Sequence, residues 1–281
     1  MFKLTLPKFR NQATPPSAAE APAAEASVGA EPAGLPYTGT QYFCPICSTS
    51  LGYFLPVDNG YLKLLDSYEY NYSLFHNETF NMLQYSCPSC HASDRERLYA
   101  LYFQKRLSES DPGKKLKFID FAPSEVNYFY RRFPMLDYRS ADLYMDGVDD
   151  KIDITNMDIY EDNSVDVFLC SHVLEHVDDD RKAMSELYRI LKPGGWGITM
   201  VPVLIYSEHI IENLPITSEA ERWRFYGQGD HVRFYNRQGF VDRLACAGFK
   251  VNLLGVEYFG ADTFERNGIH KRSVLYVVEK I

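Results

Sequence analysis

The sequence predicts an α/β fold in which helices cover both faces of a mostly parallel sheet, and residues 164–195 carry most of this prediction. Residues 165–170 form a short apolar, β-branched run, as expected of a strand buried on both faces. A polar turn and three aspartates, 178–180, follow, and the aspartates can cap a helix. Apolar residues then recur at helical spacing: Ala183, Met184, Leu187, Ile190 and Leu191. Lys192-Pro193-Gly194-Gly195 predicts the end of that helix.

The rest of the chain from residue 94 fits the same class. Further strands are expected at 117–121, 138–141, 148–152 and 196–203, with a closing pair at 251–258 and 273–279. Helices are expected at 94–107, 125–133 and 237–247. In doubly wound sheets, ligands bind outside the carboxyl ends of the strands. The turns that follow residues 121, 141 and 170 are therefore the first places to look for a site.

Composition limits the organisation and the function. A chain of 281 residues can hold one α/β domain and a small module. Residues 1–36 are rich in alanine and proline, so we expect a disordered tail. No apolar run approaches the roughly 18 residues of a membrane span, and the basic start lacks the apolar core of a secretory signal. The net charge of −9 disfavours nucleic acid as a partner, and six cysteines without an export signal favour a reducing compartment, the cytoplasm.

Two cysteine pairs predict a metal site before the α/β domain. Cys44-Pro-Ile-Cys47 and Cys87-Pro-Ser-Cys90 form a CxxC…CxxC pattern, in which two knuckles can complete a tetrahedron around one structural Zn²⁺. The alternative is four reduced cysteines in a small core. Cys170 and Cys246 lie in apolar patterns and are expected to be core thiols.

The phrases SHVLEHV and LKPGG within residues 171–195 resemble the fourth motif region of class I S-adenosylmethionine-dependent methyltransferases of the type 11 branch. The resemblance implies a Rossmann-like seven-stranded sheet, mostly parallel with one antiparallel strand, and S-adenosylmethionine as cofactor. Together with the cysteine pairs, it divides the chain into a tail at 1–36, a zinc-ribbon module at 37–93 and a methyltransferase domain at 94–281.

The resemblance also implies the cofactor residues. Asp120, Ala122, Pro123 and Ser124 stand where relatives carry an acidic residue and a glycine-rich turn, although the glycines are absent here. Asp142 follows the second strand by the spacing of a ribose-binding acid. The remaining candidates are Asp153 and Ile154 beside the adenine and Ser171 after the fourth strand.

His172, His231 and Arg233 are the catalytic candidates. His172 occupies the turn nearest the expected methyl group and can act as a base, or it can orient the loop by hydrogen bonds. Residues 204–235 are too long for a simple connection and are expected to form a lid. In that lid, an Asp230–His231 pair can act as a base and Arg233 can clamp an acceptor anion, or all three can form structural ion pairs. Glu175 and His176 are interpreted as mostly structural.

These features predict an enzyme that transfers a methyl group to a small-molecule or saccharide acceptor. Two alternatives stay open. The zinc module could bind RNA for methylation, although residues 41–92 contain only one basic residue, Lys63. A binding protein that kept the fold but lost the cofactor would explain the missing glycines.

Overall fold

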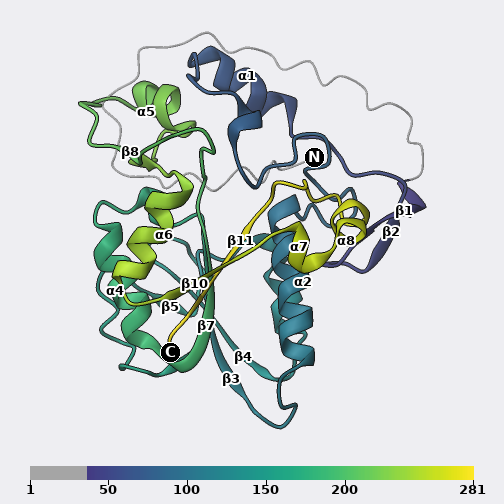
Figure 1. Cartoon of the computed structure of the whole chain (residues 1–281), viewed down its shortest axis with the longest axis vertical. Helices are drawn as coiled ribbons and strands as arrows, with labels where there is room; N and C mark the ends of the chain where they lie inside the picture. Colours follow the sequence, from purple (N-terminus) through teal and green to yellow (C-terminus); the bar gives the residue numbers. More distant parts are fainter. Residues whose placement is uncertain (1–36) are drawn as a thin grey trace.

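The computed structural model describes residues 37–281, so the tail predicted at 1–36 lies outside the described residues. Its centre is a seven-stranded sheet in the order β10-β11-β7-β6-β3-β4-β5 (Figure 1). The strands are β3 (Leu116–Phe121), β4 (Leu136–Asp142), β5 (Asp150–Lys151), β6 (Val165–Ser171), β7 (Leu191–Met200), β10 (Lys250–Leu254) and β11 (Leu275–Glu279). Only β11 runs antiparallel to its neighbours, which confirms the predicted fold class.

Helices cover both faces of this sheet (Figure 1). One side carries α4 (Asp180–Ile190) and α6 (Arg237–Cys246), and the other carries α2 (Asp94–Ser108), α7 (Val256–Phe259) and α8 (Ala261–Arg266). Local chemistry fixes the helix starts. Ser93 and Glu96 form a capping box at α2, and the Asp179 side chain accepts a bond from Lys182 N at α4.

Three local predictions differ from the structure. The helix α4 ends at Ile190, just before the Lys-Pro-Gly-Gly segment as predicted, but that segment already belongs to β7, which was expected to begin at residue 196. The helix expected at 125–133 is split into a 3₁₀ turn, η2 (Glu125–Asn127), and α3 (Tyr128–Arg131). The strand expected at 251–258 ends at Leu254, since Gly255 begins the short helix α7.

The amino-terminal segment and the predicted lid pack against each other. The first contains β1 (Thr38–Cys44), β2 (Thr49–Leu51), α1 (Asn59–Ser67) and η1 (Leu74–His76). The second contains β8 (Ile211–Glu212), α5 (Glu219–Tyr226) and β9 (Arg233–Phe234). Helices α1 and α5 lie at the same end of the molecule (Figure 1), and Asn71 N donates to Arg224 O at 2.9 Å.

A small apolar core joins these two segments. It is built from Leu204, Tyr226 and Phe234, with Tyr70 and Tyr72 packed against them. The main core, in turn, runs without interruption from Cys44 and Cys87 to the central strands. Within residues 37–281, no helix has both the length and the apolar character needed to cross a membrane.

Candidate active site

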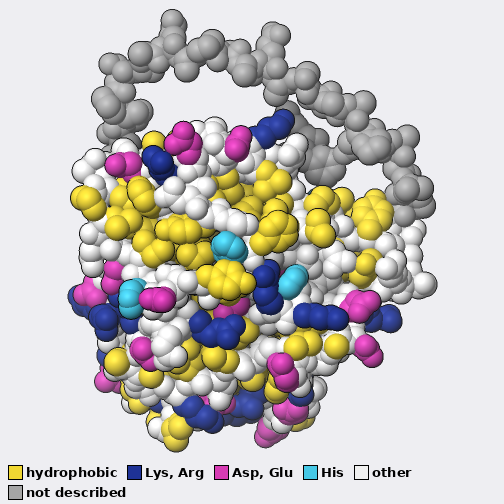
Figure 2. Space-filling view, turned by 45° about the horizontal axis from the view of Figure 1, so that its top comes forward, with side chains coloured by type: hydrophobic (Ala, Val, Ile, Leu, Met, Phe, Trp, Pro, Cys, Tyr) yellow, Lys and Arg dark blue, Asp and Glu magenta, His cyan; other side chains and the backbone are white. Residues whose placement is uncertain are grey.

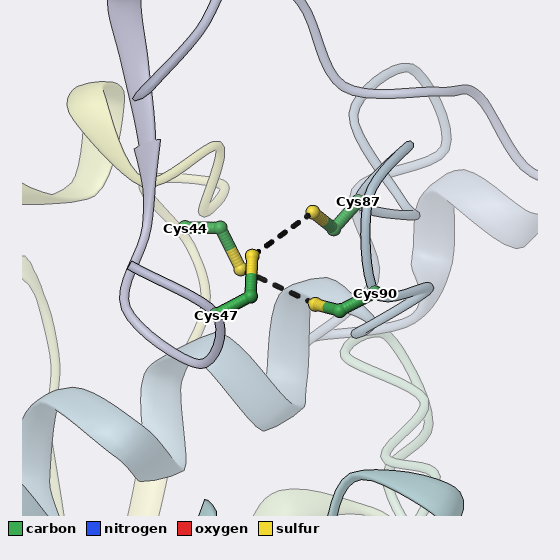
Figure 3. A group of neighbouring side chains, drawn as sticks. All are labelled: Cys44, Cys47, Cys87 and Cys90. Carbon is green, nitrogen blue, oxygen red and sulfur yellow. Dashed lines mark hydrogen bonds between the residues drawn. The ribbon is translucent and has the colours of Figure 1, made fainter. Parts of the chain in front are cut away.

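The four cysteines of the two pairs converge on one point (Figure 3). Cys44 Sγ lies 3.7 Å from Cys90 Sγ, and Cys47 Sγ lies 3.9 Å from Cys87 Sγ. Zinc–sulfur bonds of about 2.3 Å in a tetrahedron place the sulfurs about 3.8 Å apart, so the cluster has the dimensions of a Zn²⁺ site.

The two knuckles have the same backbone geometry. Ser48 N donates to Cys44 O and His91 N donates to Cys87 O, at 2.8 and 2.9 Å. Ser48 and His91 both adopt left-handed φ angles, 59° and 60°. The same turn in two segments far apart in sequence is expected of a site that binds one ion. His91 does not belong to the cysteine cluster.

A crevice opens at the carboxyl ends of β3, β4 and β6. Its larger part has a volume of about 610 Å³, and an adjoining part has about 270 Å³. The predicted cofactor residues all line it. Asp120, Pro123, Ser124 and Ser171 line the larger part, Asp153 and Ile154 line the smaller, and Ala122 and Asp142 line both.

The turn after β3 reaches its shape without glycine. Ala122 has a φ of +52°, a left-handed conformation that costs an L-residue roughly 1–2 kcal/mol. Its N–H donates to Ala141 O at 2.9 Å, which holds the strained turn against β4. The strain lies where the chain faces the crevice, as is common at ligand sites.

Asp120 is a buried acid at this turn, only 2% exposed. Burial raises its pKa to about 7, although Tyr138 Oη donates to Asp120 Oδ2 at 2.8 Å and opposes this shift. A cation in the crevice would favour the ionised carboxylate.

The other predicted cofactor residues already have partners. Asp142 Oδ1 accepts bonds from Tyr144 N and Met145 N at 2.6 and 2.7 Å, which folds the turn after β4. Asp153 Oδ1 accepts from Thr155 N and Oγ1, both at 2.8 Å. Ser171 Oγ is 2.9 Å from Tyr99 Oη, so α2 fixes the serine at the floor of the crevice.

A third cavity, of about 130 Å³, lies beside the crevice. Aromatic side chains from the amino-terminal segment and the lid form much of its wall: Tyr61, Tyr70, Phe80, Tyr85, Tyr226 and Phe234. Figure 2 shows hydrophobic side chains gathered over the upper half of one face, with histidines along the lower border of that area. His172 lines both this cavity and the larger part of the crevice, so it stands where the two spaces meet.

His172 belongs to a cluster of histidines and acids. His172 Nδ1 lies 2.9 Å from Glu175 Oε1, and its φ is +56°. His176 Nδ1 lies 3.1 Å from Asp230 Oδ2, and the His176 and His231 rings meet edge to face at 4.6 Å.

Burial and mutual charge shift the pKa values in this cluster. Burial would raise the pKa of Glu175, but His172 and the other histidines hold it down to about 2. Burial lowers the pKa of His231 to about 3, and His176 adds to this effect. Burial, followed by Arg95, also lowers the pKa of His172. At neutral pH, the lowered pKa values leave His172 and His231 neutral.

Two catalytic predictions about the lid do not match the structure, which instead has the ion pairs given as the alternative: Asp230 with His176 and Arg233 with Glu212. Asp230 contacts His176 rather than forming the expected pair with His231. Arg233 lines none of the three cavities, and its guanidinium donates to the carbonyls of Leu174, Val177 and Asp178. Because these carbonyls flank Glu175 and His176, Arg233 holds the loop that carries them instead of clamping an acceptor.

Sequence reasoning missed several wall residues. Tyr85 and Arg95 line both the larger crevice and the third cavity. Within residues 37–281, the Arg95 guanidinium has no hydrogen bond or ion pair, which leaves it available to a carboxylate. The aromatic-rich stretch between the cysteine pairs is a signal that could have found Tyr85.

Residues 113–199 match the family model described as a methyltransferase domain, which confirms the resemblance stated from the sequence. The ubiquinone/menaquinone biosynthesis C-methyltransferase UbiE of Bdellovibrio bacteriovorus is 30% identical over 112 residues, or 35% of this chain and 47% of that protein. The thiol S-methyltransferase TMT1B of Rattus norvegicus is 35% identical over 85 residues, 27% of this chain and 31% of that protein. The chain thus spans less than half the length of these curated relatives.

Solved structures include a SAM-dependent methyltransferase from Archaeoglobus fulgidus. It is 14% identical, the match covers 66% of this chain and 93% of that chain, and the TM-score is 0.42.

Proposed function

We propose, from the methyltransferase domain at residues 113–199, that this chain transfers a methyl group from S-adenosylmethionine to a small-molecule acceptor. One observation carries the proposal: a crevice at the carboxyl ends of β3, β4 and β6 meets a separate aromatic cavity at His172. Two adjoining spaces with a shared polar residue are what transfer between two bound molecules requires.

The residues that line the crevice suit S-adenosylmethionine. The bound cofactor supplies a methyl group on a positively charged sulfur. Asp120 and Asp142, 2% and 8% exposed, are acids that face the crevice. In this proposal, Asp142 accepts bonds from the ribose hydroxyls, Ile154 and Asp153 lie at the adenine, and Asp120 faces the cationic methionine end. Ala122, Pro123 and Ser124 form the turn between them, and Ser171 is part of the floor.

His172 is proposed as the base for a hydroxyl acceptor. Its neutral imidazole can take the proton of the acceptor hydroxyl while the oxygen bonds to the methyl carbon. S-adenosylmethionine, held by the crevice residues, would supply the methyl group on a sulfonium whose neutral thioether leaves as the oxygen attacks in line. His172 has a side chain that is 20% exposed, so the proton can leave to solvent.

Three observations support a small acceptor. The third cavity has a volume of only about 130 Å³. Its wall is largely aromatic, which suits an apolar or ring-bearing body. The net charge of −9 works against a polyanionic acceptor, and the printed names of the relatives describe C-methyl and S-methyl transfer rather than RNA methylation.

The four cysteines are proposed to hold one structural Zn²⁺. Four thiolates fill all positions of a tetrahedron, so this ion would have no open position for catalysis. Its proposed task is to fix the ends of residues 48–86, the segment that contributes much of the third cavity's wall. Replacing Cys44 and Cys87 together by serine should remove one equivalent of zinc. Cys246→Ser should remove none, because Cys246 lies outside the cluster and is exposed rather than in the core as expected.

Calorimetric titration with S-adenosylhomocysteine tests the cofactor site. The wild-type chain should bind it, and Asp142→Ala should bind it at least about tenfold more weakly, since each lost charge-assisted bond costs about 1.5–3 kcal/mol. Asp158→Ala is the matched control, because Asp158 is exposed and lines none of the three cavities.

The outcomes separate the alternatives. No binding by the wild type would remove the methyltransferase proposal. Equal binding by Asp142→Ala and Asp158→Ala would remove the ribose contact. Binding without turnover over a panel of hydroxyl, thiol and amine acceptors would favour a non-catalytic binding protein.

A further inference from the structure

A second group of metal-ligating side chains is separate from the four cysteines. Glu175, His176 and His231 each offer a ligand atom, and these atoms lie within 4.8 Å of one another. We infer that these three residues bind a divalent transition-metal ion at the junction of the cofactor crevice and the acceptor cavity. The role of this ion rests on the proposed function, whereas the arrangement of its three ligands does not.

The strongest support comes from Glu175, which is fully buried at 0% exposed. Neither of its carboxylate oxygens accepts a hydrogen bond of good geometry, and the nearest nitrogen, His172 Nδ1, makes a 2.9 Å ion-pair contact to Oε1. A buried carboxyl group without hydrogen bonds is costly, whereas a bound cation would satisfy both oxygens.

Both histidines are held in the way that metal-binding histidines are held. His231 Nδ1 lies 3.2 Å from Tyr226 O, and His176 Nδ1 lies 3.1 Å from Asp230 Oδ2. Metal-ligating histidines usually direct one ring nitrogen to a carbonyl or carboxylate, which fixes the ring and leaves the other nitrogen for the ion. Here the nitrogen left in each ring is Nε2.

The surrounding chain brings the ligands together before any ion binds. Val232 N donates to Glu175 O at 2.9 Å, joining the two segments that carry the ligands. Arg233 fixes the same loop through the carbonyls of Leu174 and Asp178, at 2.7 and 2.8 Å. A site on a rigid, bonded frame is preorganised for binding.

The ligand set indicates the kind of ion. Two imidazoles and one carboxylate bind catalytic zinc and non-haem iron(II), whereas magnesium and calcium prefer oxygen ligands alone. Three protein ligands leave open positions. His176 lines the cofactor crevice and His231 lines the acceptor cavity, so an open position would face the acceptor. The matching acceptor class is a small molecule with a hydroxyl group, whose oxygen the ion would hold and polarise.

Cobalt titration of the full chain, with its cysteine site occupied by zinc, tests this inference. The wild type should bind one Co²⁺ whose spectrum lacks the intense thiolate-to-metal band expected of a cysteine site. His231→Gln should abolish this binding, and Asp230→Asn should weaken it about 10- to 100-fold, as loss of a supporting carboxylate does. His209→Gln is the matched control, because His209 is exposed on the same lid.

Glu175→Gln provides a second test that does not depend on the lid. It should lose Co²⁺ binding while circular dichroism and zinc content stay unchanged. A wild type that binds no Co²⁺ beyond the cysteine site, or a His231→Gln variant that binds it as His209→Gln does, would overturn the inference.

S-adenosylhomocysteine binding in the same samples separates the two proposals. If S-adenosylhomocysteine binds and Co²⁺ does not, the proposed function stands and the proposed metal site is wrong. If Co²⁺ binds and S-adenosylhomocysteine does not, the reverse holds.

Discussion

Individual residues at the ends of β3 and β6 carry the strain and the charge of the site. Ala122 and His172 follow these two strands, and both have φ angles in the left-handed region, +52° and +56°. These turns direct the backbone after β3 and β6 away from the crevice that lies at the ends of the two strands. Asp120 adds a buried acid there, and burial raises its pKa to about 7.

The strain at Ala122 leads to a stability prediction. Ala122→Gly should raise the free energy of unfolding by up to about 1 kcal/mol. Glycine adopts positive φ without the penalty that alanine incurs, and its larger loss of backbone entropy on folding offsets part of this gain. Ala141→Gly, at the fully buried β4 residue to which Ala122 N donates, should instead lower it by about 1–2 kcal/mol. Urea unfolding of both variants measures the difference. If both variants change the free energy of unfolding in the same direction, Ala122 is not strained.

The pKa of Asp120 predicts a pH dependence of cofactor binding. In the free protein, this pKa is raised to about 7, so the acid is largely protonated at pH 6. A bound cation favours the carboxylate, and binding should therefore release a proton near pH 6 and strengthen as pH rises towards 8. Titration of S-adenosylmethionine in two buffers of different ionisation enthalpy measures the release.

Asp120→Asn is the control for this effect. It should bind more weakly at pH 8, and its affinity should change less between pH 6 and pH 8. If the variant keeps the full pH dependence of the wild type, another group is responsible.

At the scale of elements, helix α2 connects the cysteine knuckles to the sheet. Its capping box fixes the start directly after the second knuckle. Its buried Arg97 donates to the carbonyls of Gln84, Tyr85, Ala92, Asn267 and Gly268. Two residues earlier, Arg95 lines the site with an unbonded guanidinium. One helix thus presents a structural arginine and an available one.

These two arginines form a matched pair for mutagenesis. Arg97→Met should lower the free energy of unfolding by at least about 3 kcal/mol, because five carbonyls each lose a hydrogen bond from a buried guanidinium. Arg95→Met should change it by less than about 1 kcal/mol, since no hydrogen bond is lost. Chemical denaturation of both variants tests the contrast, and equal losses would contradict the assigned roles.

At the scale of the whole molecule, the acceptor cavity is assembled from three distant parts of the chain. The segment between the cysteine knuckles, the end of β7 and the lid all contribute to its wall. Tyr68 stacks on Trp223 with ring centroids 5.4 Å apart, and Ile205 N donates to His76 O at 2.9 Å. The lid is therefore tied to a segment whose two ends are fixed by the cysteines.

This coupling predicts that loss of the cysteine-bound ion will loosen the lid. In the Cys44→Ser, Cys87→Ser variant, amide hydrogen exchange should become faster in residues 204–226, although no cysteine lies there. Exchange in β3 and β6, at the centre of the sheet, should stay slow. An unchanged lid, with faster exchange confined to residues 38–93, would show that the two segments open independently.

Local sequence patterns predicted the helices and strands well. They predicted sites that are built from distant residues only in part. The strand at 165–170 and the helix from Asp94 were recognised because their apolar spacing and caps are contained within a few residues. The helix stops before the Lys-Pro-Gly-Gly segment as expected, but β7 begins earlier than expected, at Leu191, which pairs with Val165 of β6. Arg233 looked like a substrate clamp because its carbonyl partners lie more than fifty residues away.

Short-range spacing in the sequence was enough to predict the α/β class, the resemblance of residues 113–199 to a methyltransferase domain and the set of four cysteines. Only the tertiary structure decided that Glu175, His176 and His231 meet, that Asp230 contacts His176, and that the segment between the knuckles forms the acceptor wall. These contacts depend on strand order and on how distant loops pack at one end of the sheet. The residues that bury and charge this site are far apart in the sequence, so no local sequence pattern predicts that they meet.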